Sequence, residues 1–108
     1  MRYAKATIVS EGLKAFGYPQ VTYYEIDGHE AVVRLVEILQ DGRIWKESLE
    51  SMRGVVFGSL RDDAPKPARY NEGDSGICEE STQDEFEGMW GKAEWSPGAK
   101  SAMSGGEA

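Results

Sequence analysis

Two Asp-Gly dipeptides, at residues 27–28 and 41–42, constrain the fold of this chain more than any other feature. Aspartate can accept hydrogen bonds from the nearby backbone and glycine tolerates positive φ, so this pair is typical of tight turns between antiparallel strands. The flanking segments, at residues 21–26, 30–39 and 43–47, are rich in β-branched and aromatic residues. Residues 30–39 would also suit a helix, but the flanking turns and the Val and Ile content favour a strand. The sequence therefore predicts an antiparallel meander.

Further elements are predicted on both sides of this meander. Residues 2–9 contain β-branched Thr7, Ile8 and Val9 and form a candidate first strand. Residues 10–19 are interrupted by two glycines and one proline, which favours a connecting loop. Residues 54–60 fit either a short last strand or a buried loop. Residues 61–76 hold two prolines and two glycines and favour a long exposed loop.

A helix is predicted to begin near Ser81. Ser81 with Asp84, or Thr82 with Glu85, has the spacing of a capping box, in which side chains satisfy backbone N–H groups that the first turn leaves without partners. Acidic residues in a first turn are also favoured by the helix dipole. An apolar face follows at helical spacing, formed by Phe86, Met89, Trp90 and Ala93. We expect this face to pack on one side of the sheet.

These elements indicate an α+β fold, with an antiparallel sheet of four to five strands and one C-terminal α-helix packed on a face. The chain has 108 residues, of which 40% are hydrophobic. This is enough for one hydrophobic core and no more. We expect a single domain over residues 1–95 and a disordered, glycine-rich tail over residues 96–108.

Cysteine usage and hydropathy bear on where the protein works. Cys78 is the only cysteine, so the chain can form no internal disulfide, and a single thiol is typical of a reducing compartment. The first residues lack the apolar stretch of a signal peptide. No segment approaches the roughly 20 apolar residues of a membrane-spanning helix. We therefore expect a cytoplasmic protein that does not bind membranes.

The charge of the chain is acidic and unevenly distributed. The formal net charge is −7. Residues 1–59 contain seven basic and eight acidic residues, residues 60–90 contain three basic and nine acidic residues, and residues 91–108 are neutral. Such a charge repels nucleic acids and anionic lipids and attracts a basic protein. A solvated loop followed by a well-capped helix would account for the same pattern without any partner.

No catalytic or metal-binding group of residues can be assembled from the sequence. His29 is the only histidine and lies beside a predicted turn, without a recognisable nucleophile or second histidine. Glu79 and Glu80 follow Cys78 and should raise the pKa of its thiol, which disfavours the reactive thiolate. Together with Asp84 they form an acidic cluster, but its spacing is not that of a calcium loop. We expect no catalysis and no bound metal or cofactor.

A set of short motifs resembles a known family. The motifs are MRY-x-K, YYEID, E-x-x-x-R-x-VE, DGRI, GVVFG and EEST-x-DEFE-x-MWGKA, and they span residues 1–94. Their most specific block runs from Tyr24 to Ile44, whereas residues 10–19 and 60–76 depart from the pattern. The chain thus resembles a bacterial family of small proteins described as a domain of unknown function, whose acidic members resemble immunity proteins of toxin systems. The family has no established activity or catalytic residues, so the resemblance carries over no catalytic role, and its immunity-like members favour a binding role.

The leading hypothesis is a non-catalytic inhibitor: an immunity-type protein that covers a basic, nuclease-type bacterial toxin with its acidic segment. A phage-encoded inhibitor of a nucleic-acid-handling defence complex, such as an anti-CRISPR protein, would follow the same charge logic. The sequence leaves the oligomeric state open. The residues expected to contact the protein partner are Asp62, Asp63, Tyr70, Glu72, Asp74, Glu79 and Glu80.

A small enzyme or metal-binding protein is the remaining alternative. It would require Glu25, Arg34 or Glu37 to converge with His29 in one pocket. Arg34 and Glu37 are an odd number of residues apart, so a regular strand should place them on opposite faces of the sheet. This spacing argues against the alternative.

Overall fold

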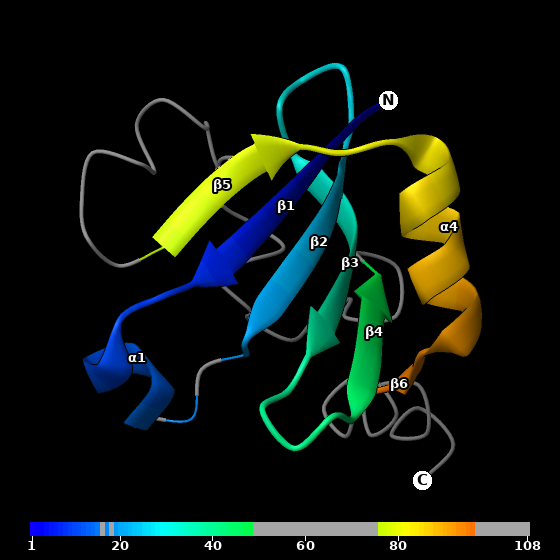
Figure 1. Ribbon diagram of the computed structural model, residues 1–108. Helices are drawn as coiled ribbons and strands as arrows, with labels where there is room; N and C mark the ends of the chain where they lie inside the picture. The colour runs from blue at the N-terminus through cyan, green and yellow to red at the C-terminus, as the bar shows by residue number, and fades with distance from the viewer. Residues whose placement is uncertain (16, 18, 49–75, 97–108) are drawn as a thin grey trace, which may run out of the picture.

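The computed structural model describes residues 1–15, 17, 19–48 and 76–96 (Figure 1). In this part the strands form one six-stranded sheet with the order β5-β1-β2-β3-β4-β6. The strands are β1 (Arg2–Ile8), β2 (Val21–Ile26), β3 (Val32–Ile38), β4 (Ile44–Ser48), β5 (Gly76–Glu80) and β6 (Glu94–Trp95). The helices are a short α1 (Glu11–Ala15) and a longer α4 (Gln83–Lys92). The α+β fold with one C-terminal helix against the sheet is confirmed.

The strands β1 to β4 form the predicted antiparallel meander. In both Asp-Gly turns the aspartate side chain accepts hydrogen bonds from the backbone of the turn. Asp27 Oδ1 accepts hydrogen bonds from the backbone N–H groups of His29 (2.8 Å) and Ala31 (3.0 Å). At the second turn Asp41 Oδ1 accepts from the N–H of Arg43 at 3.0 Å, and Gly42 has a φ of 94° that a side chain would oppose.

Two strands and one helix were not predicted. The strand β5 pairs antiparallel with the outer side of β1, and the two-residue β6 pairs parallel with β4. The prediction of a loop over residues 10–19 was wrong in part, because α1 occupies residues 11–15. In α1 the N–H of Lys14 donates to the carbonyl of Ser10 at 3.1 Å, so one helical turn forms despite Gly12 and Gly17.

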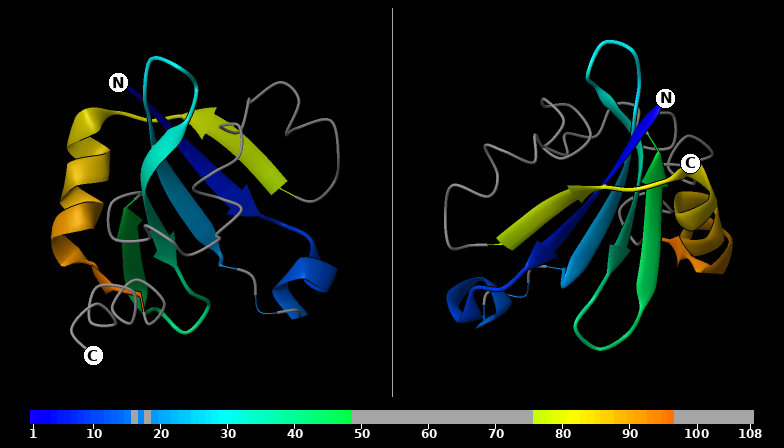
Figure 2. Two further views of the ribbon diagram at one scale, coloured as in Figure 1. Left: turned by 180° about the vertical axis from the view of Figure 1, so that it is seen from behind. Right: turned by 45° about the horizontal axis from the view of Figure 1, so that its top comes forward.

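The helix α4 begins and packs as its sequence predicts. Thr82 is the N-cap, and its Oγ1 accepts a hydrogen bond from the N–H of Glu85 at 3.2 Å. The helix lies along one face of the sheet (Figure 2). Phe86 is fully buried, and its ring centroid lies 5.4 Å from that of Tyr3. Met89, Trp90 and Ala93 contact the same core cluster.

The sheet has a different core cluster on each face. On the side that α4 covers, which we call the helix face, the buried cluster consists of Tyr3, Tyr23, Val36, Phe86 and Ala93. On the opposite side, which we call the second face, the buried cluster consists of Ala4, Ile26, Val32, Leu35 and Cys78. The alternation expected for neighbouring residues of a strand is seen at Tyr23 and Tyr24, which belong to opposite faces.

Several sequence predictions concern residues outside the described ranges. These are the possible strand over residues 54–60, the exposed loop predicted over residues 61–76 except for its last residue, and most of the C-terminal tail. That last residue, Gly76, is buried and begins β5, so the loop prediction was wrong there. The tail was predicted to begin at residue 96. Ser96 itself is described and buried, and its N–H donates to the carbonyl of Lys46 at 3.0 Å.

Candidate functional site

The strand β5 and the first turns of α4 together carry a run of exposed acidic side chains. Five acidic residues and no basic residue occur between positions 79 and 87. They lie on β5, at one end of the strand order, and on the N-terminal part of α4, which follows β5 in the chain. We call this surface the acidic edge; its members, all exposed, are Glu79, Glu80, Asp84, Glu85 and Glu87.

Three members of the acidic edge form ion pairs with cations of the sheet. Glu80 accepts a hydrogen bond from Arg2 Nη1 at 3.0 Å. Glu85 Oε1 lies 3.9 Å from the ammonium of Lys5, and Glu87 Oε1 accepts from Arg34 Nη2. These cations come from β1 and β3, so the edge is tied to strands that are distant in sequence.

Glu79 and Asp84 form no ion pair with any described residue. Glu79 lies opposite Lys5 in the register of β5 on β1, but Lys5 forms its ion pair with Glu85. Both side chains are exposed. They are therefore the members of the acidic edge whose charge remains most available to a partner.

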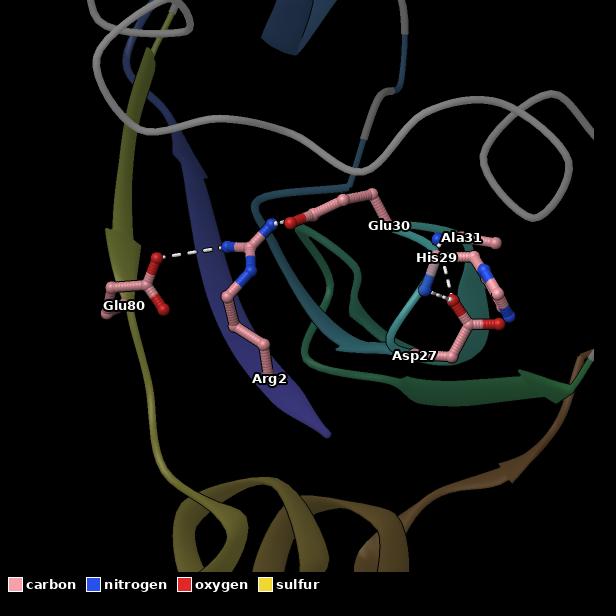
Figure 3. A network of polar contacts seen from close by, with 6 residues as sticks. All are labelled: Arg2, Asp27, His29, Glu30, Ala31 and Glu80. Carbon is pink, nitrogen blue, oxygen red and sulfur yellow. Dashed lines mark hydrogen bonds and ion pairs between the residues drawn. The ribbon is translucent and has the colours of Figure 1, made fainter.

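Arg2 is shared between two carboxylates on the second face (Figure 3). Its Nη1 donates to Glu80 on β5, and its Nη2 donates to Glu30 in the β2–β3 turn at 2.6 Å. Glu30 has a φ of 64°, the left-handed conformation, which is uncommon for a residue other than glycine. In the same turn, hydrogen bonds from the backbone N–H groups of Ala31 and His29 lower the pKa of Asp27.

Arg34 is also shared between two carboxylates, on the helix face. Its Nε and Nη2 donate to the two oxygens of Glu25 at 2.6 and 2.7 Å, and Nη2 also donates to Glu87. The hydroxyl of Tyr3 donates to Glu25 at 2.9 Å. Glu25 is only 6% exposed, and the hydrogen bonds from Arg34 lower its pKa although burial acts in the other direction. The guanidinium also lies 4.5 Å from the Trp90 ring centroid.

The local charge balance follows from this sharing. Three cations form ion pairs with five carboxylates. The pairs are Arg2 with Glu30 and Glu80, Arg34 with Glu25 and Glu87, and Lys5 with Glu85. With Glu79 and Asp84 there are seven carboxylates against three cations, which leaves a formal charge of 3 − 7 = −4. The acidic edge thus keeps a negative field after its internal ion pairs are counted.

The structure places two of the seven residues predicted to contact a partner. Glu79 and Glu80 lie on the acidic edge, on alternate sides of β5. Asp62, Asp63, Tyr70, Glu72 and Asp74 lie outside the described residues. Sequence reasoning missed the three sheet cations. The pairing of β5 with β1 brings Arg2 to Glu80, and the packing of α4 on the sheet brings Lys5 and Arg34 to Glu85 and Glu87.

Of the residues of the enzyme alternative, the structure brings together Glu25 and Arg34 but not Glu37. Glu25 and Arg34 form an ion pair on the helix face. Glu37 lies on the second face, opposite Thr22 on β2 and Trp45 on β4. His29 is exposed in the β2–β3 turn. Within the described ranges no three of the His, Cys, Asp and Glu side chains are grouped so that they could hold a metal ion.

Cys78 lies buried on the second face, in its core cluster. Burial, followed by the charge of Glu80, raises the pKa of its thiol, in the direction expected from the sequence. The reactive thiolate is therefore disfavoured, and the side chain serves the core.

The sequence analysis also did not predict that two acidic residues, Glu37 and Glu47, become neighbours. They lie on β3 and β4 on the second face, and Glu47 is buried. Folding the chain symmetrically about the second Asp-Gly turn pairs residue 35 with residue 47 and residue 37 with residue 45. That register was the available signal, since it places both carboxylates on one face.

The comparisons with known proteins add no relative to this description. No family model, curated protein or solved structure matches the chain. Among the described helices, none has both the length and the apolar character that crossing a membrane requires.

Proposed function

We propose that this chain is a non-catalytic binding protein whose acidic edge contacts a basic protein partner. The observation that carries the proposal is the formal charge of −4 that remains around the edge, with Glu79 and Asp84 exposed and outside the described ion pairs. A surface charge of one sign steers an oppositely charged partner and speeds its association. The three ion pairs to the sheet hold the other carboxylates in fixed positions, which lowers the entropy cost of binding.

The partner that best fits such a surface is a protein that itself binds nucleic acid. Carboxylates can take the place of phosphates opposite its lysine and arginine side chains, so binding would block its nucleic-acid site. The resemblance of the motifs to a family with immunity-like members favours a nuclease-type toxin in the cytoplasm as this partner. A defence complex targeted by a phage-encoded inhibitor presents the same chemistry.

Neutralising the two exposed carboxylates should weaken capture of the partner. We expect the tagged Glu79→Gln/Asp84→Asn variant to recover a basic protein from host lysate with roughly tenfold lower affinity than the unchanged chain. Two exposed ion pairs contribute up to about 1 kcal/mol each, and about 1.4 kcal/mol corresponds to a factor of ten. Quantitative mass spectrometry of the captured proteins at 50 and 500 mM salt measures the effect.

The matched control is Glu11→Gln/Glu94→Gln, which removes the same charge from exposed sites on α1 and β6. This control should capture the basic protein as the unchanged chain does. Equal recovery by all three proteins, or capture that salt does not weaken, would contradict the assignment of the surface. Nuclease activity of the captured protein, and its loss on binding, would separate a toxin from a defence complex.

A further inference from the structure

Glu37 and Glu47 lie next to each other on the second face of the sheet. In the register of β3 on β4, Leu35 pairs with Glu47 and Glu37 pairs with Trp45. Residues directly opposite in an antiparallel pair share a face, and so do positions two apart on one strand. Glu37 and Glu47 are therefore diagonal neighbours, within reach of each other's long side chains.

Glu47 is in an environment that opposes a full negative charge. It is 4% exposed, and its partner across the strands, Leu35, is fully buried. Its Oε2 is buried and accepts no hydrogen bond. Burying an ionised carboxylate without compensation is strongly unfavourable, and two such charges side by side also repel each other.

The other charged or titratable groups facing this pair do not neutralise it. From β2 the neighbours on this face are Thr22 and Tyr24, and from β6 the neighbour is Glu94, which is itself acidic. Two described cations lie towards this face. Arg2 is bound to Glu30 and Glu80, and Arg43, which is bound to Asp41 at 2.7 Å, lies over the ring of Trp45.

We propose that Glu37 and Glu47 hold one proton between them, and that losing this proton weakens the pairing of β3 with β4, so that the protein has a built-in sensitivity to pH. The shared proton reduces the charge of the pair from −2 to −1. Its loss places two adjacent charges on neighbouring strands of a buried face. The strand β4 also carries β6 and so holds the end of α4, which extends the effect to that side of the sheet.

The raised pKa of Glu37 is consistent with this geometry. Burial, then the charge of Glu47 and a hydrogen bond to it, raise the pKa of Glu37 from its usual 4.5 to about 7. The folded state therefore binds more protons than the unfolded state between these two values. Stability must then fall as the pH rises through this window, and the loss is complete above the folded pKa.

The pH dependence of unfolding is the first test. We expect the equilibrium constant for unfolding, from urea titrations, to rise between pH 5 and 7 by up to about tenfold per pH unit. The lowered pKa of Glu25 acts in the opposite direction, but below this window. Glu37→Gln should flatten the curve, since an amide can donate to Glu47 as the shared proton does. Glu94→Gln, on the same face, should keep the slope of the unchanged chain.

The second test reads the proton directly and needs no variant to fold. Carboxyl carbon NMR shifts of glutamate in the unchanged protein should show one of the two resonances from Glu37 and Glu47 titrating near neutral pH. If both resonances titrate below pH 5.5, or if stability is constant or increases between pH 5 and 7, the proposal is wrong. A near-neutral midpoint that Glu94→Gln removes would also overturn it, because the proton would then belong to another pair.

Discussion

Replacing Arg34 with alanine is expected to lower the free energy of unfolding by about 3–5 kcal/mol. The reason is the carboxylate that the change leaves behind. The Glu25 side chain is 8% exposed, and both of its oxygens accept hydrogen bonds from Arg34. Without the guanidinium this buried charge keeps only the hydroxyl of Tyr3 as a described hydrogen-bond donor. Urea unfolding at pH 7, followed by circular dichroism, measures the loss.

Arg43→Ala is the matched control for this prediction. Arg43 is also hydrogen-bonded to a carboxylate and lies over a tryptophan ring, but its side chain is 63% exposed. The control should therefore cost about 1 kcal/mol or less. Adding Glu25→Gln to the Arg34→Ala variant should recover part of the loss, because the remaining group is then neutral. Equal effects of the two arginine variants would show that the Glu25 carboxylate is not buried as described.

The second large effect is expected at Phe86, whose replacement with alanine should cost about 3–5 kcal/mol. Phe86 is the buried residue of α4. Its ring contacts Tyr3 on β1 and lies 5.0 Å from the guanidinium of Arg34. Truncation would leave a cavity between the helix and the sheet, and thermal or urea unfolding would report the loss.

Met89→Ala is the matched comparison on α4, since Met89 is only partly buried against the same core cluster as Phe86. We expect this variant to lose below about 2 kcal/mol, as less apolar surface leaves the core. A Phe86 variant no less stable than the Met89 variant would contradict the packing of α4. Because Phe86 and Arg34 are in contact, their effects should not add, and a double-mutant cycle would measure the coupling.

Arg34 and Phe86 matter for the acidic edge because their side chains hold α4 against the sheet. Asp84 and Glu85 lie in the first turn of this helix, and Glu87 is held by Arg34 itself. If α4 loosens, these carboxylates lose their fixed positions relative to Glu79 and Glu80 on β5. The two stability predictions therefore test the scaffold on which the proposed binding surface depends.

The local parts of this fold could be predicted from the sequence. Each Asp-Gly turn is stabilised by bonds between residues at most four positions apart. The N-cap at Thr82 is equally local. The apolar side of α4, from Phe86 to Ala93, follows from its helical spacing alone, and its residues pack on the core cluster of the helix face.

The elements that were missed depend on distant partners. The strand β5 has the sequence GICEE, with Ile77 half exposed and two charged residues, so no apolar alternation marks it as a strand. Pairing with β1, whose residues lie 68 to 76 positions earlier in the chain, produces it. The two-residue β6 likewise exists only through its parallel pairing with β4. The helix α1 is a single short stretch that contains Gly12, which disfavours a helix.

The candidate site could be predicted from the sequence only in part. The acidic run at residues 79–87 is visible in the sequence, and its charge is the ground on which a basic partner is proposed. Its division into paired and unpaired carboxylates is not, since the pairing cations lie on β1 and β3. The same holds for Glu37 and Glu47, which become neighbours only when β3 and β4 pair.

The most direct test of the central claim is to map the surface that the captured basic protein contacts. The measurement is the change in backbone amide resonances of the isotope-labelled chain when that protein is added at low salt. We expect the largest changes from β5 through the first turn of α4, with Glu79 and Asp84 among them, and their reversal at 500 mM salt. Changes concentrated at α1 and the β3–β4 turn, with the acidic edge unaffected, would contradict the account.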